Sequence, residues 1–185
     1  MTDKRDIPLM PGEISEDISD SSRLISDAYG FMRSMEKEEI EISRNSFFCF
    51  GAGRTGRAIC MSLAKKGARA VYIMDILPKL AKDLSEELRT YGIRAYAVEP
   101  GDYSMIYNCN IVINASGVGE GDSIGKSPLP EEFIETDQFY FDAVSALEET
   151  AFLGNAKLRG CRTKNGTDMA GFKEEKRQEL MNMQF

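Results

Sequence analysis

The residues whose types and spacing could do chemistry begin with a cluster of glycines. Gly51-Ala52-Gly53-Arg54-Thr55-Gly56 follows the apolar run Phe47–Phe50 and precedes a segment with helical spacing. In a G-x-G-x-x-G loop between strand and helix, the first glycine permits a tight turn, the second lets a pyrophosphate approach the backbone, and the third lets the helix pack on the strand. The helix then offers free N–H groups to the phosphates. The pattern predicts dinucleotide binding, and the alternative is a tight turn without a ligand.

An acidic residue stands where a ribose would be bound. Asp75 ends a second apolar run, Ala70–Met74, and lies 24 residues after Gly51, close to the spacing of roughly 20 typical of the ribose-binding acid. Its carboxylate would accept hydrogen bonds from the ribose hydroxyls and repel a 2′-phosphate, so the sequence favours NAD over NADP. A role as cap of the next helix is disfavoured, because Pro78 suits the first helical position and makes Leu77 the cap.

The composition excludes several other chemistries. The 185 residues contain no histidine, which rules out Ser-His-Asp and Cys-His catalysis and histidine-ligated metals. The net charge is −7 and no basic run is present, which argues against nucleic acid or an anionic membrane as the main partner. The cysteines form no C-x-x-C pair, so we expect reduced thiols and no metal site. They are Cys49, Cys60, Cys109 and Cys161.

Length and hydropathy indicate one compact, non-exported domain. The apolar runs are far shorter than the roughly 20 residues of a membrane span, and Met1–Gly12 lacks the apolar centre of a secretory signal. We therefore expect a soluble, cytoplasmic protein. Residues 1–22 carry six acidic residues with Pro8 and Pro11 and are expected to form a mobile acidic arm. Residues 23–185 are expected to form the dinucleotide-binding domain.

The elements that must position these residues alternate along the chain. An amphipathic helix is expected over 27–42, with Ser26 or Asp27 as its cap. Short, continuously apolar strands then alternate with helices, which is typical of parallel sheets covered on both faces. The pattern predicts a doubly wound α/β fold of the Rossmann type, with strand order 3-2-1-4-5-6. Strands are expected at 46–50, 70–74, 93–98, 110–114, 138–142 and 160–163, and helices at 55–65, 78–91, 103–107, 148–158 and from about 167.

Several further motifs resemble one enzyme family. The stretch Ile111–Gly119 reads I-V-I-N-A-S-G-V-G, which resembles the loop after the fourth strand in shikimate and quinate dehydrogenases, I-N-A-[TS]-x-x-G-M. Ser26–Phe31 is similar to the family's N-T-D-x-x-G-F, which opens the helix linking its two domains. Asp142–Leu153 resembles D-x-V-Y-x-P-x-x-T-x-L-L, and the run from Asn165 to Met169 resembles the start of G-x-x-M-L-x-x-Q. The resemblance covers about residues 23–175 and lies in the ordered set of motifs.

The resemblance implies a cofactor domain without its substrate domain. The family's amino-terminal domain carries the catalytic lysine and would need far more residues than the 26 that precede Asp27. The resemblance places Asn114, Ala115, Ser116 and Gly117 against the nicotinamide ribose. Some family positions differ here: tyrosine is replaced by Ser145, proline by Leu147 and glutamine by Lys173.

The resemblance also suggests a catalytic candidate. It makes Asp27 a proton-handling carboxylate, although an aspartate beside Ser26 at a helix start is more often a cap. Lys173 could supply an ammonium, but it lies in a mixed charged run that is typical of a solvated helix face.

Methyltransferases also have a glycine loop and an acidic residue at the end of the second strand. The N-A-S-x-x-G loop that begins at Asn114 disfavours this class.

Two functional hypotheses follow. The first is the NAD(P)-binding domain of a shikimate-dehydrogenase-like oxidoreductase, with the substrate domain missing or supplied by a separate chain or a homodimer. We expect this chain alone not to oxidise shikimate or quinate at a useful rate. The second is a non-catalytic NAD(H)-binding module with a regulatory or interaction role.

Overall fold

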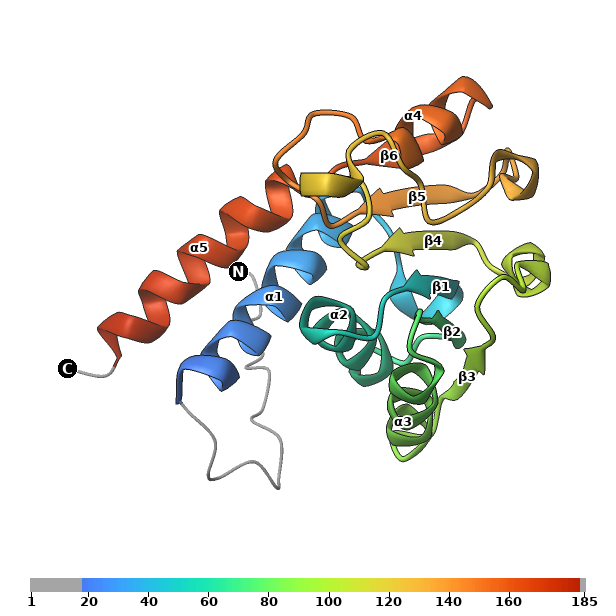
Figure 1. Ribbon diagram of the computed structural model, residues 1–185. Helices are drawn as coiled ribbons and strands as arrows, with labels where there is room; N and C mark the ends of the chain where they lie inside the picture. Colours follow the sequence, from blue (N-terminus) through green and yellow to red (C-terminus); the bar gives the residue numbers. More distant parts are fainter. Residues whose placement is uncertain (1–17, 184–185) are drawn as a thin grey trace.

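A six-stranded parallel sheet forms the centre of the computed structural model, which describes residues 18–183 (Figure 1). The strand order is β3-β2-β1-β4-β5-β6, and each neighbouring pair is parallel. This is the doubly wound Rossmann arrangement expected from the sequence. The strands are β1 (Ser46–Phe50), β2 (Ala70–Met74), β3 (Arg94–Val98), β4 (Ile111–Asn114), β5 (Phe139–Asp142) and β6 (Arg162–Lys164).

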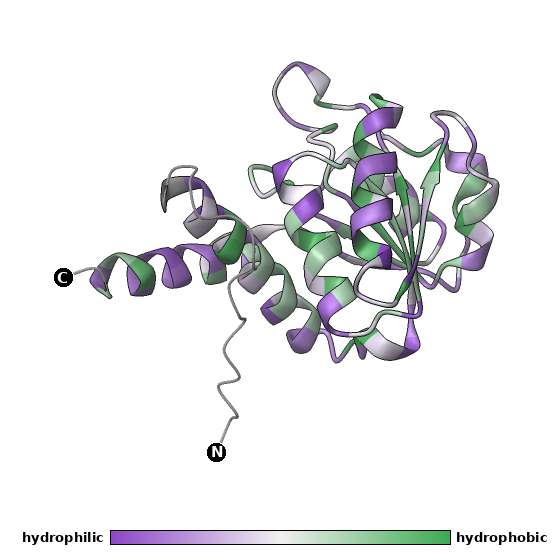
Figure 2. Cartoon of the chain, turned by 90° about the horizontal axis from the view of Figure 1, so that it is seen from below, coloured by the Kyte–Doolittle hydropathy of each residue, from purple (hydrophilic) through white to green (hydrophobic). Residues whose placement is uncertain are grey.

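Helices connect the strands and cover the sheet. The α-helices are α1 (Ile18–Lys37), α2 (Arg54–Lys65), α3 (Pro78–Arg89), α4 (Ala151–Leu158) and α5 (Thr167–Asn182). Short 3-10 turns are η1 (Ile42–Arg44), η2 (Ser104–Asn108), η3 (Gly121–Ser123) and η4 (Glu131–Phe133). Helices α2 and α3 are amphipathic, with their apolar residues buried toward the sheet, whereas α5 projects away from it (Figure 2).

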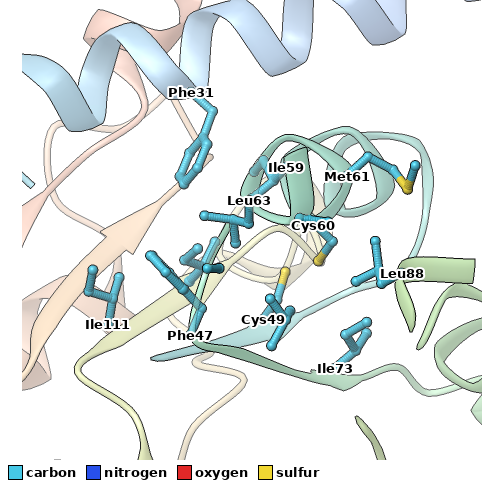
Figure 3. Close-up of a cluster of buried hydrophobic side chains, with 14 of the residues drawn as sticks. Phe31, Phe47, Cys49, Ile59, Cys60, Met61, Leu63, Ile73, Leu88 and Ile111 are labelled. Atoms are coloured by element: carbon cyan, nitrogen blue, oxygen red, sulfur yellow. The ribbon is translucent and has the colours of Figure 1, made fainter. Parts of the chain in front are cut away.

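The core consists of two apolar clusters, one on each face of the sheet. On one face, Phe31 of α1, Leu63 of α2 and Leu88 of α3 pack against strand residues such as Phe47 (Figure 3). On the other face, α4 and η2 cover Phe48 and other strand residues. Every residue of β1, β4 and β5 is buried, which is why their sequences are continuously apolar rather than alternating. Because these strands pair in parallel and in register, their carboxyl ends lie together at one edge of the sheet.

The first helix differs from the sequence expectation. It spans Ile18–Lys37 rather than 27–42, and residues 42–44 form the separate turn η1. Ser26 and Asp27 therefore lie inside the helix, and the expectation that either caps it is wrong; the Ser26 hydroxyl donates to the carbonyl of Arg23. The helix extends toward the amino terminus because Leu24, Ile25 and Ala28 are wholly or partly buried, and this burial outweighs the weak helix preference of the serines.

The expected acidic arm falls largely outside the described residues. Residues 1–17 are not described, whereas residues 18–22 form the first turn of α1 rather than part of an arm. Within residues 18–183, no helix is long and apolar enough to cross a membrane.

Two helices extend beyond the sheet on the side of the carboxyl ends of β4 and β5. Helices α1 and α5 lie side by side (Figure 1). They approach closely at Gly30, where an added Cβ would lie 2.5 Å from the carbonyl oxygen of Met169. Met169 itself is buried in the core. The pair thus carries its side chains to the edge of the sheet at which the loops after β1 and β4 emerge.

Candidate functional site

The glycine loop has the three steric properties that a close-approach turn needs. Gly51 has φ +97°, a conformation that side chains rarely adopt, and an added Cβ would lie 2.6 Å from the carbonyl oxygen of Ala115. A Cβ on Gly56 would lie 2.0 Å from the carbonyl oxygen of Gly51, so only glycine lets α2 pack this tightly. A Cβ on Gly53 would meet nothing within 4 Å. The space beside Gly53 is therefore open to a ligand, whereas Gly51 and Gly56 are tightly packed against neighbouring backbone.

Helix α2 begins directly behind this open space. Gly53 is its N-cap, and no side chain caps the helix. The first N–H groups of a helix have no partner within it and carry its positive end. Arg54 and Thr55 form the start of this turn. The arrangement is suited to an anionic group that lies against Gly53.

Asp75 contacts the glycine loop from the end of β2. Its Oδ2 accepts a hydrogen bond of 2.7 Å from the N–H of Ala52, and its Oδ1 accepts one of 2.9 Å from the N–H of Leu77. Leu77 is the N-cap of α3 and Pro78 its first residue, as expected. The sequence analysis did not predict that Asp75 would hold these two backbone segments together. An aspartate whose side chain can accept from the N–H two residues later is, however, a known signal of a turn. A carboxylate has about four acceptor positions, which leaves room for ribose hydroxyls.

Asn114 fixes the loop that follows β4. Its Nδ2 donates to the carbonyl oxygen of Val118 at 2.8 Å, and its Oδ1 accepts from the hydroxyl of Ser116 at 2.7 Å and the N–H of Ser116 at 3.2 Å. The N–H of Ala115 donates to the carbonyl oxygen of Phe50 at the end of β1. Gly117 has φ +77°. The loops after β1 and β4 are therefore in contact where the strand order of the sheet reverses.

A buried carboxylate supports this second loop from behind. Asp142, at the end of β5, is fully buried, and its oxygens accept hydrogen bonds from Nδ2 of Asn114, the N–H of Val144 and the hydroxyl of Thr150. Thr150 also caps α4, because its Oγ1 accepts from the N–H of Leu153. Burial raises the pKa of Asp142 above its ordinary value, although the three hydrogen bonds oppose the shift.

Asp27 of α1 contacts the first turn of α2, whereas Asp75 contacts the glycine loop at Ala52. Its side chain is fully buried, and its Oδ1 is 2.5 Å from Nζ of Lys173 on α5. Its Oδ2 accepts from the hydroxyl of Thr55, in the first turn of α2, at 3.5 Å. The interpretation of Lys173 as part of a solvated face is wrong, because α1 and α5 approach closely enough at Gly30 for this lysine to reach across.

The described part of the chain offers no candidate metal site. Among residues 18–183, no group of three or more Cys, Asp or Glu side chains could hold a metal ion. The four cysteines are buried as free thiols.

Comparison with known proteins identifies relatives of this arrangement. The chain is 30% identical over 148 residues to the shikimate dehydrogenase (NADP(+)) of Moorella thermoacetica, with 78% of this chain and 50% of the relative covered. The crystal structure of shikimate 5-dehydrogenase from Listeria monocytogenes in complex with shikimate and NAD has a TM-score of 0.78 and 25% identity, with 84% of this chain and 57% of that chain covered. The chain is homologous to the shikimate dehydrogenases.

The homology is confined to part of these enzymes. The chain spans about half the length of the relatives it matches, and no family model matches it. The NADP(H) and shikimate complex of the Thermus thermophilus shikimate 5-dehydrogenase has the same fold, with a TM-score of 0.72, 24% identity, and 87% of this chain and 64% of that chain covered. The chain is a shikimate-dehydrogenase-like Rossmann domain, as the sequence motifs predicted.

Proposed function

We propose that this chain binds NAD(H) as the cofactor domain of a shikimate-dehydrogenase-type oxidoreductase. The observation that carries the proposal is the open space at Gly53, which is the N-cap of α2 and follows Ala52, whose N–H is hydrogen-bonded to Asp75. The bound states of two relatives support the class of ligand, since their structures contain NAD or NADP(H). The reaction would be the interconversion of a cyclic alcohol and its ketone, by analogy with the shikimate bound in both structures.

Each part of the dinucleotide has proposed contacts in this chain. The pyrophosphate would lie against Gly53 and the N–H groups at the start of α2. The adenosine ribose would hydrogen-bond to the free acceptor positions of Asp75. The nicotinamide half would then extend across the loop formed by Asn114, Ala115, Ser116 and Gly117. The bound cofactor would supply a hydride as NAD(P)H or accept one as NAD(P)⁺, and these residues would hold and orient it.

The substrate-binding half would come from elsewhere. The matched part of this chain corresponds to about half of each relative, so residues outside the matched part would hold the substrate hydroxyls, and we propose a separate chain or a second copy as their source. The non-catalytic NAD(H)-binding module is the alternative. The homology to enzymes along most of this chain favours the oxidoreductase.

We expect NAD(H) to bind this chain more tightly than NADP(H). The 2′-phosphate would bring negative charge beside the carboxylate of Asp75, and Ile76 and Leu77, which follow, offer no cation. In the Asp75→Asn variant, the affinity for NADP(H) should rise relative to NAD(H), because the repulsion is removed while one acceptor oxygen is kept. Titration calorimetry with both cofactors measures the two dissociation constants.

The matched control for this test is Asp137→Asn. Asp137 is exposed near the amino ends of the strands, beside Gln138 and Phe139, so its substitution changes the net charge equally but far from the proposed ribose site. The control should bind both cofactors like the wild type. Equal or tighter binding of NADP(H) by the wild type would show that Asp75 does not contact the ribose. An absence of binding to either cofactor would overturn the proposed function.

A further inference from the structure

Lys173 of α5 and Asp27 of α1 form an ion pair between a partly exposed ammonium and a buried carboxylate. The carboxylate of Asp27 is fully buried, whereas the side chain of Lys173 is 31% exposed. A buried carboxylate is costly unless an opposite charge lies close to it, and the ammonium at 2.5 Å provides that charge. An ammonium has three N–H donors. With one directed at Asp27, donors remain for a group that approaches from the exposed side.

The pair lies beside the glycine loop, on the side where a nicotinamide would be held. Thr55, in the first turn of α2, hydrogen-bonds to Asp27. One turn along α1 from Asp27, the ring of Phe31 packs edge-on against Phe141 of β5, with 5.3 Å between ring centres. A residue of α1 thus reaches β5, whereas Asp75 lies at the end of β2. A dinucleotide bound across the reversal point, with its adenosine half at β2, directs its other half toward α1.

The close helix contact fixes the position of the lysine. A Cβ on Gly30 would lie 3.2 Å from both the Cβ and the N of Lys173, so a larger residue at Gly30 would push α5 outward. The neighbouring lysine on the same helix has a different environment. Lys176 pairs with Glu179 at 3.2 Å within α5 and lies over the ring of Tyr29. Lys173 instead reaches across to a buried carboxylate on another element.

We propose that Lys173 donates the proton to a substrate carbonyl oxygen during its reduction, with Asp27 as the positioning residue. This inference rests on the proposed function. When a carbonyl carbon accepts a hydride from a reduced nicotinamide, the electron pair of the C=O bond moves to oxygen. The oxygen then takes a proton from Nζ of Lys173, so that one O–H bond forms and one N–H bond breaks. The products are an alcohol, the oxidised nicotinamide and a neutral amine, which water reprotonates.

The substrate class follows from what the chain contains. Proton donation at Lys173 requires only a carbonyl group that fits against the loops after β1 and β4. A small ketone has few hydroxyl groups and needs no second domain to bind them, whereas a polyhydroxylated ring does. We therefore expect the 185-residue chain to reduce hydroxyacetone slowly with NADH.

The decisive variant is Lys173→Arg, because it keeps a cation beside Asp27 and so preserves the ion pair. A guanidinium does not release its proton in proteins. General acid catalysis contributes roughly 10²–10⁴-fold, so we expect the variant to lose about 100-fold or more in kcat/KM for hydroxyacetone. Its dissociation constant for NADH and its melting temperature should stay close to those of the wild type. The matched control Lys176→Arg should retain the wild-type rate.

Chemical rescue separates proton transfer from packing. In Lys173→Ala, added ethylamine should restore part of the lost rate, because the small ammonium can occupy the space beside Asp27. A packing role would show no such dependence on amine. If Lys173→Ala does not fold, the comparison of Lys173→Arg with Lys176→Arg still decides the question.

A measurement without turnover tests the same contact. After reductive ¹³C-methylation of the lysines, which preserves their charge, the NMR signal that is absent in Lys173→Arg reports on Lys173. That signal should shift when propane-1,2-diol, the product alcohol, is added to the NADH complex, in which no hydride can be transferred, whereas the Lys176 signal should not.

The outcomes separate this inference from the proposed function. NADH binding without reduction of hydroxyacetone, equal rates for the wild type and Lys173→Arg, or an unshifted Lys173 signal would each overturn the role of Lys173 and leave cofactor binding intact. A chain that does not bind NADH would overturn both.

Discussion

The Gly56→Ala variant is expected to be strongly destabilised. An added Cβ would lie 2.0 Å from the carbonyl oxygen of Gly51, and neither group can move without displacing β1 or α2. Inserting a methyl group into a packed region costs roughly 1–3 kcal/mol and occasionally more, and a backbone clash this close belongs at the upper end of that range. Urea unfolding followed by circular dichroism measures the free energy of unfolding.

The matched control is the same substitution at Gly53. A Cβ there meets nothing within 4 Å, and its φ of −68° suits alanine, so Gly53→Ala should unfold like the wild type. If the pyrophosphate lies against Gly53, this variant should nevertheless lose affinity for NADH. A wild-type unfolding midpoint in Gly56→Ala would contradict the close approach of α2 to β1. A wild-type affinity for NADH in Gly53→Ala would contradict the proposed position of the phosphates.

The Asp142→Asn variant is the second change from which a large effect is expected. The carboxylate of Asp142 accepts from three donors, on Asn114, Val144 and Thr150. An amide in its place has one acceptor oxygen, so its NH₂ group would face a donor and leave buried groups unpaired. Each unsatisfied buried donor costs about 1–3 kcal/mol. Urea unfolding should show a loss of this order, and the exposed Asp83→Asn should show almost none.

The pH dependence of stability provides a separate test of Asp142. Burial raises the pKa of Asp142 in the folded protein above the ordinary 3.8. At pH values between 3.8 and this raised pKa, the folded state binds more protons than the unfolded state. Stability then falls as pH rises through this window. The contribution is absent from Asp142→Asn, so the stability difference between wild type and variant should narrow from about pH 4 to neutral pH. A difference that widens with pH would show that the hydrogen bonds outweigh burial.

The strand pattern and the glycine loop were the most predictable parts of this molecule. Continuous apolar runs such as Phe47–Phe50 and Ala70–Met74 identified buried parallel strands, because burial on both faces leaves no room for polar side chains. The strand order followed from the position of the glycine loop after the first strand. Pro78 marked the start of α3, because its ring fits only the first turn.

Contacts between distant segments were not predictable in the same way. The start of α1 was misplaced because Ser26 and Asp27 are typical N-cap residues, whereas packing of the neighbouring apolar residues extends the helix through them to Ile18. The pairing of Lys173 with Asp27 depends on how closely α1 and α5 pack. A charged run along a helix contains no information on that distance, and so Lys173 was assigned to a solvated surface.

The hydrogen bonds that hold the loops after β1 and β4 in place have a consequence for the thermodynamics of binding. The N–H of Gly51 is bonded to Met74, that of Ala52 to Asp75 and that of Ala115 to Phe50, so these backbones are ordered before any ligand arrives. When a ligand binds a loop that is already ordered, the binding free energy is not reduced by the entropic cost of ordering that loop. Association should therefore be fast and close to rigid-body, and amide hydrogen exchange in both loops should already be slow in the free protein.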